Sequence, residues 1–207
     1  MSMNRAIHGA FRRDLGRFTA ALDAFPDGDR HRAGQLKTAW DYFNFELTRH
    51  HQGEHDIAWP ALRRLGVSED LLARMDAEHD RLASALSEAD SAMTALAATP
   101  VAETAAAAGK AIDALTTVAE EHMSHEEAEL EPVYLEKRDT PEMKQMGRQF
   151  GRGNPLVAGK FLAWVQHGAS EDELAGLRDS IPPPVLAIFG RVAGLPYHLR
   201  IAPIWKS

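Results

Sequence analysis

The sequence predicts an all-α fold: an up-down-up-down four-helix bundle followed by a C-terminal, partly helical extension rich in proline and glycine. In residues 1–138, apolar residues recur at alternating spacings of three and four, which is the period of a helix with one buried face. From residue 139 this pattern gives way to frequent Gly and Pro. The 207-residue chain therefore divides into a bundle, 1–138, and an extension, 139–207, packed on it.

Start and stop signals separate four predicted helices. The first ends at Pro26-Asp27-Gly28, and the second runs to Leu65-Gly66 with Pro60 marking a kink or break. The third begins after the N-cap Ser68, and the fourth at the pair Thr99-Pro100. Because the connections are short, neighbouring helices are expected to be antiparallel. The apolar stripes are Phe11, Leu15, Phe18 and Leu22; Leu36, Trp40, Phe43 and Leu47; Leu71, Met75, Leu82 and Leu86; and Ile112, Leu115 and Val118.

The extension is predicted to contain several short helices. They are expected at 141–149, at 155–167, after the capping box Ser170-x-x-Glu173, and at 184–193. No catalytic motif is found in this segment. It is expected to pack on the bundle or on another subunit, and a homo-oligomer formed through it is one possibility.

Composition excludes several classes of function. The net charge of −7 argues against nucleic acid and against an anionic membrane surface as partners. No apolar run approaches the roughly 20 residues that span a bilayer, and the N-terminus lacks the apolar segment of a secretory signal. The absence of cysteine is typical of a protein in a reducing cytoplasm, which is the location that we expect. The chain has no cysteine, so a metal would have to be held by histidines and carboxylates.

Each of the four stripes contains a histidine when it is extended by helical spacing, and two of them also contain a glutamate one turn later. An i,i+4 pair lies on one face of a helix, so both side chains can reach the same metal or two adjacent metals. The residues are His8 on the first helix, His50 and Glu54 on the second, His79 on the third, and His122 and Glu126 on the fourth.

An internal repeat relates the two halves of this set. The pairs His8/His79, His50/His122, Glu54/Glu126 and Pro60/Pro132 are separated by 71, 72, 72 and 72 residues. Any one of these histidines alone would be better explained as a packed or surface residue. Together, six unpaired polar groups on a bundle seam would each cost about 1–3 kcal/mol, against about 5–15 kcal/mol for a whole domain. The pattern therefore predicts a pseudo-twofold dinuclear metal site with nitrogen and oxygen ligands.

Neighbouring polar residues are predicted to lie outside this set. His51 and His55 point about 100° away from the stripe, which favours the surface, although His51 could swing in as an extra ligand. His125, one turn from His122, is a candidate for supporting a ligand. Glu127, one position off the stripe, is expected to have no part in the site.

These motifs resemble the hemerythrin family, in its HHE cation-binding branch. The resemblance covers roughly residues 1–135 and rests on His8, HHQGEHDIAWP, EHDRL at 78–82, and HMSHEEAELEP. It implies a four-helix bundle holding two iron ions in an oxo- or hydroxo-bridged diiron centre, with both glutamates as bridges. The ligands carried over by position are His8, His50, Glu54, His79, His122 and Glu126. Oxygen-carrying members usually have one more histidine, where this chain has Met75, which leaves a free position, a water, or an added ligand such as His51.

The resemblance implies a non-haem diiron protein that binds O₂, NO or peroxide for sensing, storage or detoxification. A diiron oxidase or peroxidase acting on a small substrate, and a module whose iron occupancy signals to a partner, stay open as alternatives. Other metalloprotein classes fit less well, because the chain has neither Glu-x-x-His nor His-Glu-x-x-His.

Overall fold

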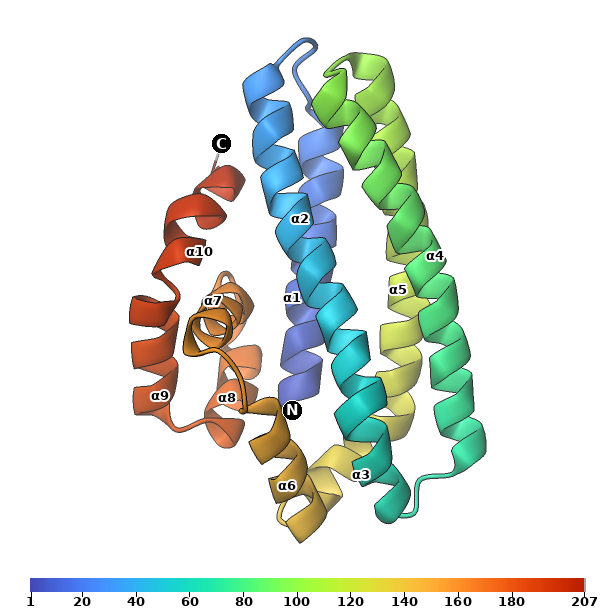
Figure 1. The fold of residues 1–207 in the computed structure, drawn as a ribbon, viewed down its shortest axis with the longest axis vertical. Helices are drawn as coiled ribbons and strands as arrows, with labels where there is room; N and C mark the ends of the chain where they lie inside the picture. Colours follow the sequence, from blue (N-terminus) through green and yellow to red (C-terminus); the bar gives the residue numbers. More distant parts are fainter. Residues whose placement is uncertain (207) are drawn as a thin grey trace.

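The computed structural model describes residues 1–206, and all of its regular structure is helical (Figure 1). Over these residues it contains no β-strand, which confirms the all-α prediction. In chain order the elements are α1 (Met3–Asp23), α2 (Arg30–Gly53), the π-helix η1 (Glu54–Ala58), α3 (Trp59–Arg64), α4 (Glu69–Ala98), α5 (Ala102–Lys137), α6 (Pro141–Phe150), α7 (Pro155–Gln166), α8 (Glu171–Ser180), α9 (Pro183–Ile188), the π-helix η2 (Phe189–Ala193), α10 (Leu195–Arg200) and the 3₁₀-helix η3 (Ala202–Lys206).

The long helices α1, α2, α4 and α5 lie side by side and form a helical bundle (Figure 1). Helix α5 packs against both α1 and α4, and α4 also packs against α2. The shorter helices that follow α5 lie along one side of this bundle, where α7 and α8 contact α1. None of the helices in the described part of the chain combines the length and apolar character needed to cross a membrane.

Two of the predicted helix boundaries have clear physical causes. Ser68 caps α4 as predicted, because its hydroxyl accepts a hydrogen bond of 3.2 Å from the backbone N–H of Leu71. The turn after α1 contains Gly28 at φ +80°, a conformation that glycine adopts without a side-chain clash.

The predicted start of the fourth helix, with Thr99 as N-cap and Pro100 as first residue, was two residues too early. The backbone N–H of Thr99 still donates to the carbonyl of Ala95, at 2.8 Å, so Thr99 closes α4. The carbonyl of Pro100 accepts a hydrogen bond of 2.8 Å from Gly28, which ties this turn to the one after α1. Helix α5 therefore begins only at Ala102.

Pro60 was predicted to kink or break the second helix, and the structure contains a π-helical turn there. A proline lacks an N–H and its ring clashes with the carbonyl four residues earlier, which here belongs to Asp56. The wider turn of η1, in which Trp59 donates to the carbonyl of Glu54, accommodates the proline without ending the helix. Pro132, its counterpart in the repeat, lies inside the continuous helix α5.

The C-terminal helices share apolar contacts with the bundle. Trp164 of α7 is buried, donates to the Asp14 carboxylate at 2.8 Å, and has its ring centre 4.9 Å from that of Phe11. Arg13 of α1 pairs with Glu173 of α8 at 2.8 Å.

Most of the short helices predicted for the extension are present. The capping box at Ser170 and the helices predicted at 141–149 and 155–167 are confirmed. The segment 184–193 forms α9 and η2, whereas α10 and η3 were not predicted.

Two apolar clusters form the core. The larger extends through the bundle and onto the C-terminal helices, and the smaller surrounds Trp59 and Met75 at the end of the bundle near α3. Along α4, His79 lies between Met75 of the smaller cluster and Leu82 of the larger one. The predicted metal ligands therefore occupy a polar layer between the two apolar clusters.

Candidate metal centre

The structure brings all six predicted ligands together, and it adds His51. The candidate ligand atoms fall into two groups, and within each group all of them lie within 4.8 Å of one another. One group is formed by His8, His50, Glu54 and Glu126, and the other by His51, Glu54, His79 and His122. Glu54 is the residue that the two groups have in common.

The Glu54 carboxylate lies between the two groups. Its Oε1 is 3.1 Å from Nε2 of His50, and its Oε2 is 3.3 Å from Nε2 of His79. Glu54 is only 2 % exposed, and neither oxygen has a partner in hydrogen-bond geometry among the described residues. Leaving a carboxylate buried in this way is costly, and a cation between the carboxylate and the imidazoles would satisfy both. The residues therefore fit a metal on each side of Glu54.

The Glu126 carboxylate contributes to one group only. Its Oε2 is 3.1 Å from Nε2 of His8 and has no hydrogen-bond partner within the described chain. Its Oε1 accepts hydrogen bonds from the Asn4 amide at 3.0 Å and the Tyr134 hydroxyl at 3.4 Å. The resemblance implied two bridging glutamates, whereas in this structure Asn4 and Tyr134 hold Glu126 toward the group that contains His8.

The surface placement expected for His51 was wrong. Its ring stacks on that of His79, with ring centres 4.2 Å apart, and lies 5.5 Å from that of His122. The bundle-facing side of a helix spans an arc of about 100° or more, so two consecutive residues can both reach inward from its edges. His55 does face solvent as predicted, with its Nδ1 3.4 Å from Asp76.

Burial and neighbouring charges set protonation states that suit metal binding. Burial and the nearby His79 lower the pKa of His51 well below its ordinary value, and burial and His79 also lower the pKa of His122. Burial raises the pKa of Glu54, but the imidazoles of His50 and His79 outweigh it and bring that pKa well below its ordinary value. Neutral imidazoles and an ionised carboxylate are the forms that coordinate metals.

The pKa of His8 shifts in the opposite direction to those of His51 and His122, because His8 is buried between two carboxylates. Burial lowers its pKa, yet the contacts with the Glu126 and Glu127 carboxylates outweigh burial and raise the pKa to about 9. Without a cation, this histidine therefore holds a proton that neutralises part of the acidic charge around it.

Two further carboxylates orient the imidazoles from outside, and sequence reasoning missed both. Nδ1 of His8 is 3.1 Å from Glu127, and Nδ1 of His122 is 3.1 Å from Glu78, so each ring presents Nε2 to the cluster. The expectation that Glu127 has no part in the site was therefore wrong, because a residue one position off the stripe still faces the adjacent helix. His125 contacts the second Glu78 oxygen at 2.7 Å and thereby supports that carboxylate.

These residues were detectable in principle from spacing. Glu127 and Glu78 are adjacent in sequence to predicted ligands, and Asn4 lies one helical turn before His8. Tyr134 lies about two turns after Glu126 on the same face of α5. Polar residues at these positions are candidates for fixing ligand orientation in any helical metal site.

The smaller apolar cluster covers one end of the site. Met75, at the position where the resemblance implied a further histidine, is fully buried in this cluster. The Trp59 ring is stacked parallel to that of His79, with ring centres 5.9 Å apart, and its Nε1 donates to Asp76 at 2.7 Å. A nitrogen donor is therefore absent at residue 75, whereas His51 supplies one from the neighbouring helix α2.

Comparison with known families agrees with this geometry. The family model described as the hemerythrin HHE cation binding domain matches residues 3–177. The chain belongs to the hemerythrin HHE cation-binding family. The hemerythrin match includes residues on both sides of the predicted boundary at 138/139, so it covers α6, α7 and most of α8 as well as the bundle. No match was found among curated proteins or solved structures.

The outer carboxylates generate a testable prediction for this hemerythrin-family site. Glu127→Ala should lower the affinity for a divalent metal about 10–100-fold, because His8 loses the acceptor that fixes its ring. Affinity is measured by competition with a chromophoric chelator. Glu129→Ala, an exposed position on the same helix, is the matched control and should leave the affinity unchanged. An affinity equal to that of the wild type in Glu127→Ala would contradict this role.

Proposed function

We propose that the chain is a non-haem diiron protein that binds a small ligand of the O₂, NO or peroxide type for sensing, storage or detoxification. The observation that carries this proposal is the sharing of one buried carboxylate, Glu54, by two groups of donor atoms. Membership of a cation-binding family supports a metal at this place. Imidazole and carboxylate donors without any thiolate suit iron, and the chain has no cysteine.

In this proposal each iron has four protein donors. One would be held by His8, His50, Glu126 and Glu54, and the other by His51, His79, His122 and Glu54. This is fewer donors than iron commonly takes, so both ions would be open to a small added ligand. When bound, the two ions would supply the coordination chemistry that captures that ligand.

Burial supports a small ligand over a bulky substrate. His8, Glu54, His122 and Glu126 are at most 2 % exposed, whereas the side chains of His50 and His79 are 10 % and 12 % exposed. Cavities of about 450 Å³ and 710 Å³ occur elsewhere on the chain, and none of the proposed ligands lines either one. Only a small molecule fits such restricted access.

The surrounding residues have roles that follow from their contacts. Glu127 and Glu78 fix the rings of His8 and His122, and Tyr134 and Asn4 hold Glu126. The apolar cluster around Met75 keeps water from one end of the site. These contacts preorganise the donors, so that little rearrangement is needed when metal or ligand binds.

A diiron oxidase or peroxidase is the second candidate. The 710 Å³ cavity favours it, because the cavity is lined by Gly53 and Asp56, which flank Glu54 closely in sequence. A small substrate held there would lie beside the helix that carries the shared carboxylate. Turnover of an added reductant with peroxide distinguishes this candidate from reversible binding.

Ligand binding is tested with the iron-loaded, reduced protein under argon. We expect O₂ or NO to change the absorption spectrum and the change to saturate at about one ligand per pair of irons. Reversal of the O₂-induced change under argon supports binding, and catalytic consumption of peroxide supports the oxidase or peroxidase. Glu54→Ala, which lacks the shared carboxylate, should show no such change. A wild-type spectrum that responds to none of O₂, NO and peroxide would contradict the proposal.

His51 provides a second test, by metal content. The wild type should bind about two irons per chain, and His51→Ala about one, because the group with His79 and His122 loses a donor. His55→Ala, which removes an exposed histidine from the same region, should retain about two irons. Two tightly bound irons and an unchanged spectrum in His51→Ala would show that His51 is not a ligand.

A further inference from the structure

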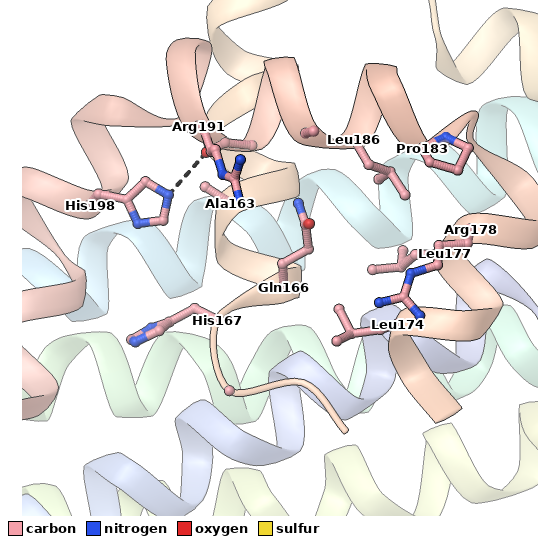
Figure 2. Close-up of a pocket in the computed structure, with 13 residues that line it drawn as sticks. Ala163, Gln166, His167, Leu174, Leu177, Arg178, Pro183, Leu186, Arg191 and His198 are labelled. Atoms are coloured by element: carbon pink, nitrogen blue, oxygen red, sulfur yellow. Dashed lines mark hydrogen bonds between the residues drawn. The ribbon is translucent and has the colours of Figure 1, made fainter. Parts of the chain in front are cut away.

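A cavity of about 450 Å³ lies among the C-terminal helices (Figure 2), and none of the proposed metal ligands lines it. Residues of α7, α8, α9, η2 and α10 line it. Leu174, Leu177 and Leu186 form an apolar part of its wall, and Gln166, Arg178 and Arg191 add polar groups. A volume of this size with apolar walls and a few polar groups is typical of a small-molecule site.

Closely packed helices lie beside the cavity. Helix α7 and the π-helix η2 approach so closely that a Cβ on Gly159 would lie 2.2 Å from Cβ of Ala193. A Cβ on Gly194 would lie 2.5 Å from Cβ of Ala163, another residue of the cavity wall. Because glycine has no Cβ, these positions allow the elements to approach this closely beside the cavity.

The formal charges that line this cavity are all positive, although the whole chain has a net charge of −7. Arg178 and Arg191 are the charged lining residues, and both have exposed side chains (Figure 2). Arg191 has no ion pair within residues 1–206, and Arg178 forms one ion pair, at 3.8 Å, with the exposed carboxylate of Glu171. The sequence from 181 to 206 contains no acidic residue at all.

The two lining histidines add hydrogen-bonding groups without adding charge of the opposite sign. Nδ1 of His167 is 2.9 Å from the Tyr197 hydroxyl, and Nε2 of His198 donates to the carbonyl of Gly190 at 3.0 Å. Burial and the nearby Arg17 lower the pKa of His167 to about 4, so this ring is neutral at pH 7. The other ring nitrogen of each histidine makes no hydrogen bond with the described residues.

We propose that this cavity binds a small organic anion that has a carboxylate at one end and a short apolar tail. The carboxylate forms charge-assisted hydrogen bonds with Arg178 and Arg191, for which planar guanidinium groups are well suited. The tail lies against Leu174, Leu177 and Leu186. This site goes beyond the proposed diiron function, and neither arginine contacts a proposed metal ligand.

The experiment is a calorimetric titration of the full-length, iron-loaded protein with octanoate. Octanoate should bind saturably at one site per chain. Octan-1-ol, which has the tail without the charge, and acetate, which has the charge without the tail, should each bind at least about tenfold more weakly. Acetate also reports any carboxylate binding at the metal centre. Equal binding of octanoate and octan-1-ol, or no binding of octanoate at millimolar concentration, would overturn the proposal.

Variants locate the binding site. Arg191→Gln and Arg178→Gln should each weaken octanoate binding about tenfold, because each removes one charge-assisted hydrogen bond. Arg74→Gln, an exposed arginine on α4, is the matched control and should leave binding unchanged. All three positions are exposed, so the variants should fold, which circular dichroism checks. Equal binding by wild type and both cavity variants would place the octanoate elsewhere and overturn the proposal.

Discussion

The buried carboxylate of Glu54 is the feature on which the rest of the site depends. It lies between two groups of imidazoles, and neither of its oxygens has a hydrogen bond among the described residues. Removing an ion from water costs several kcal/mol even after relaxation, a large part of the roughly 5–15 kcal/mol that stabilises a domain. One cation on each side of the carboxylate would offset this cost, because the carboxylate oxygens and imidazole nitrogens would then be metal ligands.

The bundle positions these donors and holds them in place. Each of the four long helices contributes at least one of them, and two apolar clusters enclose the polar layer along the bundle. The C-terminal helices reinforce α1 on its outer side, where Trp164 packs on Phe11 and Phe11 in turn lies against His50, with ring centres 5.4 Å apart. The extension therefore supports a helix that supplies His8, and it also contains a cavity with its own charge and lining.

Much of this arrangement was predictable from spacing alone. The alternation of three and four places His8, His50, His79 and His122 on the buried stripes, and the 72-residue repeat identifies Glu54 and Glu126 as equivalent. A helical wheel places His51 about 100° away and predicts the surface, because it ignores how wide the bundle-facing side of each helix is. The buried stripes do not include Glu127 and Glu78, because these residues face a neighbouring helix and not the centre of the bundle.

Residues at equivalent positions of the repeat also differ in local structure and in their contacts. Pro60 and Pro132 occupy equivalent positions, yet the first follows a π-helical turn and the second lies within a continuous α-helix. Glu54 and Glu126 are likewise equivalent in sequence, but Asn4 and Tyr134 bind one oxygen of Glu126, and nothing comparable binds Glu54 within residues 1–206. Such asymmetry arises from tertiary contacts that a period in the sequence does not record.

The central claim is that Glu54 is shared by two metal ions, and anomalous diffraction from crystals of the iron-loaded chain tests it most directly. Data collected at the iron absorption edge should show two peaks about 3.5–4 Å apart, one on each side of the Glu54 carboxylate. One peak should lie among His51, His79 and His122, and the other among His8, His50 and Glu126. A single peak, or two peaks that do not flank Glu54, would contradict the account.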